Sequence, residues 1–399
     1  MAIRGKSQTT TAPRLFLAHG PGDAAGTLKK WTMGIEDDSI IAKTYSAQIF
    51  ELTNELGAEL LVVTDNINSY THKNRRISVE SHIMGDLGSG WRYWLNMKKH
   101  ADITARKAYD FGADAAIVSF HYGLFSLPAF KRYNIPIILD MHNTVWPMGC
   151  KPNLIKQFIF KAIAISGRDA LAGVIGVSPE CGRQLKQLIG EKPTFNHIPQ
   201  YPVSLKDITI DNSFPSEFRI LFAGRIESMK GVFDILDASE ILVRMGYPQV
   251  KWIIAGKGSA EAELRDQIVG RNLGCFIELK GQLTRDKLTD ELAKSQATIT
   301  PTRTGFAEGL AKAPLESLIP GIPSLMSSVV PAAEIVKNAA LVFPPSSPAE
   351  IANAVAKMLD SPSIYDSLCA ESRGLKHLLF DPQYSYKKAV LGALSECLG

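Results

Sequence analysis

The stretch ATITPTRTGFAEGLAKAPLESLIPGIP, residues 297–323, joins an apolar strand, a polar turn and the beginning of a helix. The apolar start predicts a buried strand that ends at Thr300, and Pro314 predicts a first helical turn, where its missing N–H removes no hydrogen bond. Glu308 then lies on the loop and Glu316 in the helix. Both carboxylates can face one crevice, where free N–H groups at the start of the helix favour an anion.

A second stretch, RILFAGRIESMKG at residues 219–231, adds cations to this picture. Its predicted strand runs into Gly224 and Arg225, and Lys230 follows five residues later. Glycine permits a close backbone approach, and two cations at the carboxyl end of a strand can converge on a diphosphate. Solvated surface charges are the alternative explanation of the two glutamates. The two stretches together predict a site for a phosphorylated and hydroxylated ligand.

These motifs, GRIESMKG followed by EGLAKAPLE, resemble the GR-x4-KG and E-x7-E pair of family 4 retaining glycosyltransferases. The resemblance covers most of the chain and is densest from about 218 to 345. It implies an α/β protein with the GT-B fold, in which two Rossmann-like domains face each other across a cleft. It also implies metal-independent transfer of a sugar from a nucleoside-diphosphate sugar to a glycan, lipid-linked or small-molecule hydroxyl acceptor, for example in cell-surface polysaccharide biosynthesis. No resident cofactor is implied.

The resemblance assigns roles to the matching residues. Arg225 and Lys230 would hold the donor diphosphate, Glu316 would bind the donor ribose, and Glu308 would meet the transferred sugar. The expected donor-binding residues are Gly22, Gly224, Arg225, Lys230, Gly256, Gly258, Glu308, Gly309, Leu310, Ala311 and Glu316. The expected catalytic residues are Glu308, His142, Arg225 and Lys230. The family usually has E-x-F-G where this chain has EGLA followed by Lys312, so the resemblance does not specify the sugar.

The N-terminal half predicts another sheet of the same kind. Strands are expected at 14–18, 59–64, 115–120, 136–140 and 173–178, and helices at 41–56, 93–111 and 153–171. Strands that alternate with helices at this interval form a parallel sheet with right-handed crossovers. The polar residues 66–90, which include HKNRR at 72–76, are expected to form a long loop.

Three polar segments follow predicted strands of this half. The turn HGPGDAAGT at 19–27 is dense in glycine, but its spacing misses a dinucleotide fingerprint by one residue. The resemblance places this turn at the cleft, with Gly22 on the donor and Asp23 as an acceptor-side candidate, although a tight turn with a capping Asp explains both. His121 and His142 also follow strands; a structural hydrogen bond is the alternative for each. The resemblance implies a cleft histidine at His142 and leaves His121 as an acceptor-side candidate.

The C-terminal half repeats the alternation. Strands are expected at 218–223, 251–255, 276–279, 297–300, 324–326 and 340–343. The expected organisation is a polar tail at 1–13, an acceptor-side domain at 14–200, a linker at 201–217, a sugar-nucleotide-binding domain at 218–380, and a segment at 381–399 whose helix packs back on the N-terminal domain, as the resemblance implies.

Composition limits the partners. The 399 residues suit two domains, and 45% of them are hydrophobic. Residues 1–200 carry 23 Lys and Arg against 17 Asp and Glu, and the remainder carries 21 against 23. This mild basic excess suits an anionic membrane surface or acceptor, and lacks the dense basic stripe of a nucleic-acid binder. The cationic helix expected at 153–171 leaves two alternatives, peripheral membrane contact or an ordinary helix that covers its sheet.

Five cysteines without a C-x-x-C pair predict reduced thiols. The opening MAIRGKSQTTTAPR has no apolar signal-peptide core, and no run of 18 apolar residues occurs. We therefore expect a cytoplasmic protein, with association on the cytoplasmic face of a membrane as an option. Two other classes stay open: a GT-B sugar-nucleotide epimerase and a non-catalytic sugar-nucleotide-binding subunit.

Overall fold

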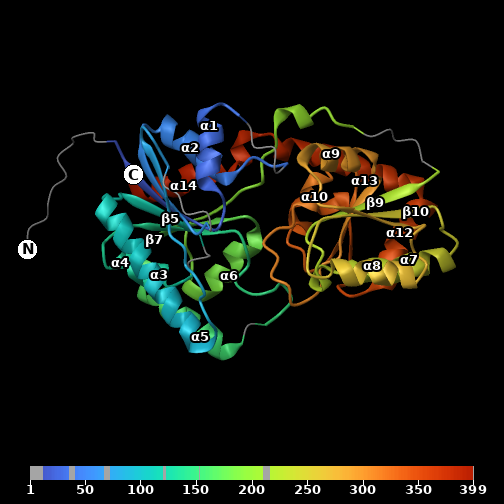
Figure 1. Cartoon of the computed structure of the whole chain (residues 1–399), viewed down its shortest axis with the longest axis horizontal. Coiled ribbons are helices and arrows are strands. Elements are labelled where there is room, and N and C mark those ends of the chain that lie inside the picture. The colour runs from blue at the N-terminus through green and yellow to red at the C-terminus, as the bar shows by residue number, and fades with distance from the viewer. Residues whose placement is uncertain are drawn as a thin grey trace, which may run out of the picture.

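The computed structural model describes residues 12–35, 41–66, 72–119, 123–151, 153–209 and 216–398. Figure 1 shows two α/β lobes side by side, the N-terminal lobe in blue to green and the C-terminal lobe in yellow to red. Each lobe is built around one sheet of mainly parallel strands with helices on its faces. This arrangement confirms the expected α/β fold class with two Rossmann-like domains.

The first sheet has the strand order β3-β4-β2-β1-β5-β6-β7-β8. Its strands are β1 (Arg14–His19), β2 (Glu59–Thr64), β3 (His72–Asn74), β4 (Ile77–Ser81), β5 (Ala115–Ser119), β6 (Ile137–Met141), β7 (Leu171–Gly176) and β8 (Thr194–Asn196). The helices of this lobe are α1 (Ala24–Thr32), α2 (Tyr45–Glu55), α3 (Gly90–Phe111), α4 (Ser126–Lys131), α5 (Leu154–Ser166) and α6 (Pro179–Ile189). Apolar side chains of the central strands are buried on both faces, as in other parallel sheets.

The prediction of a long loop at 66–90 is wrong for much of the described part of that range. β4 pairs in parallel with β2, and β3 pairs with β4 in an antiparallel hairpin at the sheet edge. Ile77 and Val79 are buried, whereas the strand residues between and after them are polar. Two apolar residues give too short an alternation to distinguish an edge strand from a polar loop. The basic cluster therefore forms β3 and the hairpin turn.

The second sheet has the order β11-β10-β9-β12-β13-β14, and all its neighbours pair in parallel. Its strands are β9 (Phe218–Ala223), β10 (Val250–Ala255), β11 (Ile277–Gly281), β12 (Ala297–Thr300), β13 (Ser324–Ser327) and β14 (Ala340–Phe343). Its helices are α7 (Val232–Arg244), α8 (Glu261–Gly270), α9 (Arg285–Lys294), α10 (Ala313–Glu316), α11 (Ala333–Val336), α12 (Pro348–Asp360) and α13 (Pro362–Leu375).

The last helix, α14 (Tyr386–Leu398), follows the second sheet in the chain but packs on the first lobe, against β7, β8 and α2 (Figure 1). Val390 and Leu394 are buried in the same apolar cluster as Ile138 of β6. On the outer side, Lys387 forms ion pairs with Glu51 and Glu55 of α2. The N-terminal lobe therefore includes the C-terminal helix in its core. The described part of the chain contains no helix with the length and hydropathy to cross a bilayer.

Candidate functional site

The carboxyl ends of β9, β10 and β12 surround a cavity of about 370 Å³ in the C-terminal lobe. The turn after β9 and the loop after β10 form one side, and the loop between β12 and α10 forms the other. Of the expected donor-binding residues, the wall includes Gly224, Arg225, Lys230, Gly256, Glu308, Ala311 and Glu316. The two motifs of the sequence therefore meet at one cavity, which we call the donor-side pocket.

Close contacts attach the turn after β9 to the loop after β12. Gly231 has a positive φ of 75°, and a Cβ added there would lie 2.0 Å from the carbonyl oxygen of Pro301. The backbone N–H of Arg303 donates to the carbonyl of Met229 at 2.9 Å. The guanidinium of Arg303 also forms a bidentate pair with buried Asp234, at 2.5 and 3.0 Å. These contacts fix the cationic turn against the loop that carries Glu308.

Lys230 forms an ion pair with Oε2 of Glu308, and the hydroxyl of Thr302 donates to the same oxygen at 3.3 Å. Both charged side chains are largely buried, with 13% and 11% of their surfaces exposed. The Lys230 ammonium also lies 4.5 Å from the centre of the Phe306 ring, in a cation–π contact. The groups that the resemblance assigns to the diphosphate and the sugar are therefore in contact with each other. A diphosphate bound at Lys230 has to share this ammonium with Glu308.

The other cations of the donor-side pocket are more open. Arg225 pairs with Glu227 at 2.8 Å, and 63% of its side chain is exposed. Lys257 and Lys312 also line the cavity, and neither forms an ion pair with another described residue. An anionic ligand in this pocket therefore meets two lysines that form no direct ion pair with a described carboxylate.

Glu316 lines the pocket and is only 7% exposed. Burial raises the pKa of this carboxyl, and the charge of Lys312 opposes the shift in part. The nearby hydroxyl of Tyr201 is buried without a hydrogen-bond partner among the described residues. Ligand hydroxyl groups that hydrogen-bond to Glu316 would compensate for the lost solvation of its charged form.

The helix that carries Glu316, α10, spans four residues. A helix of one turn has only a small macrodipole, so the expected anion site at its start depends on individual amides and side chains. Ala311 has a φ of 64°, in the left-handed region, at the position where the family motif has glycine. The backbone N–H groups of Ala311 and Lys312 have no acceptor among the described residues.

A second cavity, of about 490 Å³, lies on the other side of the same loop and faces the N-terminal lobe. The turn 19–22 after β1, Tyr45 of α2 and His142 after β6 form its N-terminal wall. The residues that it shares with the donor-side pocket are Glu308, Ala311 and Lys312. The segment 308–312 is therefore a common wall between the two cavities. We call the second one the acceptor-side pocket.

The N-terminal lobe holds this common wall in place. The Ser178 hydroxyl donates to the carbonyl of Gly309 at 2.6 Å, and the Thr144 hydroxyl lies 3.5 Å from the carbonyl oxygen of Glu308. A Cβ added at Gly309 would lie 2.1 Å from the carbonyl oxygen of His142. Glycine at this position thus permits the two lobes to meet at backbone distance.

His142 belongs to a buried polar cluster beneath the acceptor-side pocket. Its Nε2 lies 2.9 Å from Oδ2 of Asp140, which is fully buried and accepts a hydrogen bond of 2.6 Å from the Tyr386 hydroxyl. The ring of Tyr45 stacks on the imidazole, with centres 4.9 Å apart. Burial opposes charge on both members, but their mutual attraction outweighs it: the pKa of His142 is raised and the pKa of Asp140 is lowered. The cluster therefore favours an imidazolium at the pocket wall.

Several expected residues lie elsewhere. Gly22 lines the acceptor-side pocket, and not the donor-side pocket as expected. Asp23 lies on neither wall; it caps α1, accepting a bond of 2.8 Å from the N–H of Gly26. Gly258 also lies outside both walls, and His121 lies outside the described residues. Gly309 and Leu310, expected at the donor, line the acceptor-side pocket.

Sequence reasoning overlooked Tyr45, Asp140, Tyr386 and Lys257 as site residues. The sequence could have indicated Asp140, because this acid ends the apolar run IILD and a buried carboxylate needs a polar or charged partner. No sequence pattern could have indicated Tyr386, because 246 residues separate it from Asp140. Its role depends on the path of α14 back to the first lobe.

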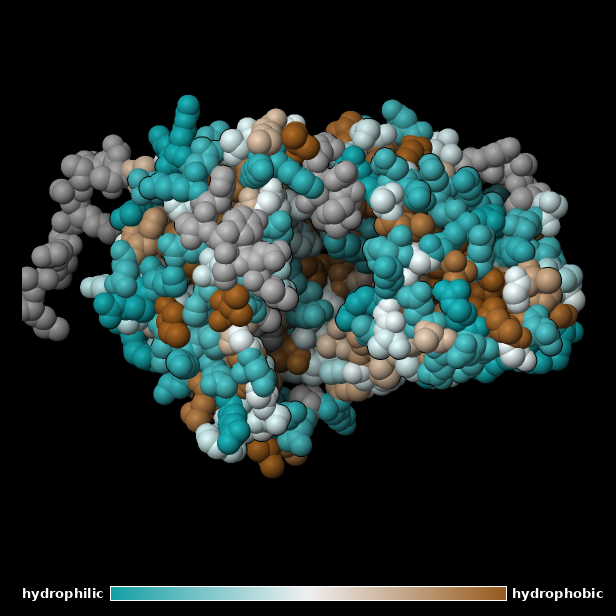
Figure 2. Space-filling model, in the orientation of Figure 1, coloured by the Kyte–Doolittle hydropathy of each residue, from teal (hydrophilic) through white to brown (hydrophobic). Residues whose placement is uncertain are grey.

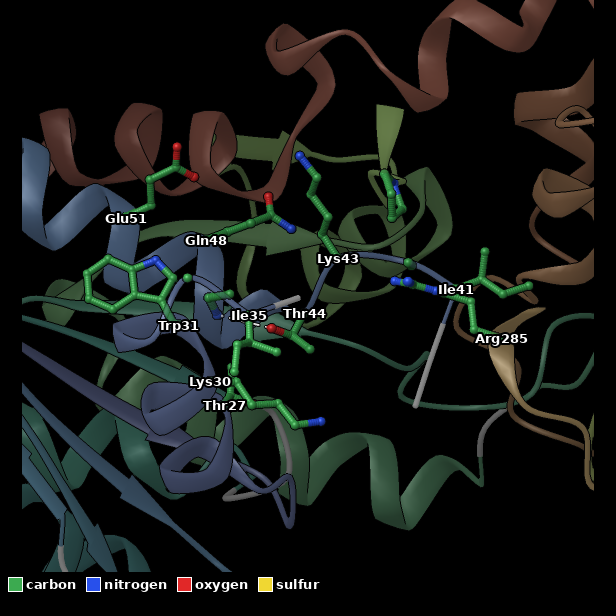
Figure 3. A pocket seen from close by; sticks show the side chains of 14 residues that line it. Thr27, Lys30, Trp31, Ile35, Ile41, Lys43, Thr44, Gln48, Glu51 and Arg285 are labelled. Atoms are coloured by element: carbon green, nitrogen blue, oxygen red, sulfur yellow. Dashed lines mark hydrogen bonds between the residues drawn. The ribbon is translucent and has the colours of Figure 1, made fainter. Parts of the chain in front are cut away.

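A third cavity, of about 310 Å³, lies between α1, α2 and Arg285 of the C-terminal lobe. Figure 3 shows Trp31, Lys43 and Gln48 around it, and an aromatic ring beside polar groups is a surface that suits sugars. Thr44 lines this cavity, and the next residue, Tyr45, lines the acceptor-side pocket. The start of α2 therefore lies between the third cavity and the acceptor-side pocket.

Residues 206–373 match the family described as Glycosyl transferases group 1. A stretch of 158 residues is 25% identical to the Alpha-D-kanosaminyltransferase of Streptomyces kanamyceticus and covers 39% of this chain. The match spans 40% of the length of that curated relative.

Solved structures resemble the chain over nearly its whole length. Sucrose-phosphate synthase from Thermosynechococcus elongatus has a TM-score of 0.70 at 17% identity, covering 97% of this chain and 99% of that one. HepE of Anabaena in complex with UDP and glucose has a TM-score of 0.65 at 15% identity, over 96% and 100%. An E. coli trehalose-6-phosphate structure bound with UDP-2-fluoro glucose has a TM-score of 0.70 at 14% identity, over 96% and 98%. The GT-B fold is therefore established, and the family match supports the expected glycosyltransferase.

Proposed function

We propose that this GT-B protein is a retaining, metal-independent glycosyltransferase that moves a sugar from a nucleoside-diphosphate sugar to a hydroxyl of a glycan, lipid-linked or small-molecule acceptor. The observation that carries the proposal is segment 308–312, the common wall of two cavities. Group transfer requires donor and acceptor to be held close together in a fixed geometry. Two cavities that meet at one carboxylate, Glu308, provide this arrangement.

The donor-side pocket suits a nucleoside diphosphate. Its wall carries Arg225, Lys230, Lys257 and Lys312. Each preorganised contact to the charge that grows on the leaving diphosphate contributes on the order of 3 kcal/mol in a closed site. Because side chains supply this charge, we propose that no divalent metal is required. The structural neighbours bound with UDP and glucose, or with UDP-2-fluoro glucose, support a nucleoside-diphosphate sugar as donor.

In the proposed reaction, the bond between the anomeric carbon of the sugar and the diphosphate oxygen breaks, and its electrons remain on the diphosphate. The acceptor oxygen forms the new bond to the anomeric carbon and gives its proton to the oxygen of the leaving diphosphate. Glu308 contacts the sugar, Glu316 holds the ribose hydroxyls, and His142 orients the acceptor as a hydrogen-bond donor. Retention of configuration rests on the motif resemblance alone.

The acceptor occupies the N-terminal side in this proposal. The acceptor-side pocket would hold the reacting hydroxyl, and the cavity beyond Tyr45 would give a longer glycan further contacts. The relative named for kanosaminyl transfer supports sugar transfer as the reaction class. We propose that the enzyme is cytoplasmic and acts in cell-surface polysaccharide biosynthesis.

The test is to incubate the pure protein with a panel of nucleoside-diphosphate sugars and hydroxyl acceptors, with and without EDTA. We expect acceptor-dependent release of nucleoside diphosphate that EDTA leaves largely intact. Loss of activity on chelation, restored by magnesium or manganese, would contradict metal independence. Conversion of the donor without an acceptor would indicate an epimerase. Tight donor binding without turnover by any acceptor would indicate a non-catalytic subunit.

A further inference from the structure

Helix α5 exposes most of its large apolar side chains. Leu154, Ile155 and Phe158 are 80%, 70% and 75% exposed, and Ala164 is the only residue of the helix that is buried. A helix that simply covers a sheet buries an apolar stripe and exposes polar residues. α5 therefore differs from the ordinary surface helix that its sequence also allowed.

The beginning of α3, which packs against α5, also exposes large apolar side chains. Trp91 and Leu95 are 68% and 56% exposed and lie four residues apart, on one side of the helix. Between them, Trp94 packs against Phe160 of α5, with ring centres 5.5 Å apart. Figure 1 shows α3 and α5 together at the lower end of the N-terminal lobe, and Figure 2 shows hydrophobic residues exposed at this end. We call this surface, formed by Trp91, Leu95, Leu154, Ile155 and Phe158, the α3–α5 face.

Positive charge surrounds the α3–α5 face. Arg92, Lys98, Lys151, Lys156 and Lys161 are exposed, and none forms an ion pair with another described residue. The sequence contains no Asp or Glu from 87 to 101 or from 141 to 168. Large apolar groups that protrude among unpaired cations match the acyl chains and phosphate groups of an anionic bilayer, which takes up both kinds of side chain.

We propose that the α3–α5 face binds the surface of an anionic lipid bilayer, with α5 lying in the interfacial plane. The chain connects this surface to the site: His142 and Asn143 line the acceptor-side pocket, and α5 begins 11 residues after Asn143. If the proposed transferase function holds, this attachment brings a lipid-linked acceptor to the N-terminal cavity. The membrane contact itself is independent of that function.

The test measures sedimentation of the full-length protein with phosphatidylglycerol vesicles and with phosphatidylcholine vesicles. We expect binding to the anionic vesicles that weakens as salt rises. The double variant Leu154→Gln/Phe158→Gln should lower the partition coefficient at least tenfold, and Lys156→Gln/Lys161→Gln should lower it on anionic vesicles. Val269→Gln, at an apolar residue of α8 that is 71% exposed, is the matched control and should bind like the wild type.

Nucleoside diphosphate affinity in solution is measured on the same variants and should stay unchanged, which separates membrane contact from donor binding. Equal partition of the wild type and the α5 variants, or no binding to anionic vesicles, would overturn the proposal. A concentration-dependent dimer that Phe158→Gln abolishes would also overturn it, because a second copy of the chain would then cover this face.

Discussion

Glu308 and Glu316 line the same cavity but have different partners, so their substitutions should differ. Glu308 pairs with Lys230 at the common wall, whereas Glu316 is buried beside Lys312 and Tyr201. Glu308→Gln should lower kcat by roughly 10² or more, because it removes a charge near the part of the donor that changes during transfer. Affinity for the bare nucleoside diphosphate should be retained or increased, since the amide no longer competes for the ammonium.

Glu316→Gln should mainly raise the donor KM and weaken binding of the bare nucleoside diphosphate, because a ribose contact acts in the ground state and transition state alike. Calorimetry with the diphosphate and steady-state kinetics on both variants measure the difference. Identical profiles would show that the roles assigned to Glu308 and Glu316 are wrong, even in an active glycosyltransferase.

Lys230→Ala should affect stability as well as binding. We expect donor affinity and turnover to fall by about 10². The ion pair is largely buried, so Thr302 would remain as the only partner of the Glu308 carboxylate among the described residues, and the free energy of unfolding should fall by about 1–3 kcal/mol. Urea denaturation measures this loss. The double variant Lys230→Ala/Glu308→Gln should recover most of the stability and none of the affinity; a double variant as unstable as the single one would contradict the pairing.

At the scale of elements, the turn after β9 depends on its fit against the loop after β12. Gly231→Ala should disrupt both, because its Cβ would meet the Pro301 carbonyl and the residue would keep a positive φ. Gly246→Ala is the matched control, since Gly246 has a φ of 91° and open space around its Cβ position. The control carries only backbone strain, about 1–2 kcal/mol.

We expect Gly231→Ala to destabilise the protein more than Gly246→Ala and to weaken nucleoside diphosphate binding at least tenfold, with no loss in the control. Denaturation and calorimetry on the two variants provide the comparison. Equal effects would mean that the contact with Pro301 does not position the cations.

The sequence predicted those elements whose signal is local. The expected strands at 59–64, 218–223, 297–300 and 340–343 agree with the observed bounds, because each is an apolar run that ends in turn residues. The hairpin of β3 and β4 was missed because its alternation of apolar and polar residues is short. The motif residues could be assigned to one cavity because parallel strands end at the same sheet edge. The partners of Asp140 could not be predicted from the sequence, because they depend on tertiary packing.

At the scale of the whole molecule, α14 links the C-terminus of the chain to His142 through Asp140. The pKa of His142 is raised from its ordinary value of 6.5, so its contribution to stability is full below that pH and is lost as pH rises through the raised value. The pKa of Asp140 is lowered from 3.8, so its contribution is present above that pH and is lost as pH falls through the lowered value. The pair therefore stabilises the fold most between about pH 4 and 6.5.

The difference in free energy of unfolding between wild type and His142→Gln should be largest near pH 5.5 and should shrink as the pH rises well above 6.5. Denaturation at a series of pH values measures it. The control is His377→Gln, at an exposed histidine that forms no ion pair with a described carboxylate, and it should change the free energy of unfolding little. A difference that grows with pH would contradict an ion pair between Asp140 and His142.

The hydrogen bond from Ser178 to the Gly309 carbonyl has a consequence for turnover. A hinge motion that widens the cleft must break this bond and move Gly309 away from the N-terminal lobe. Glu308 stays beside Lys230, because both residues belong to the C-terminal lobe, but the common wall loses the hydrogen bond that holds it against the N-terminal lobe. If nucleoside diphosphate leaves only from the open cleft, its release rate depends on how easily this hydrogen bond breaks. Ser178→Ala should accelerate nucleoside diphosphate release in stopped-flow measurements, whereas an unchanged release rate would separate the two events.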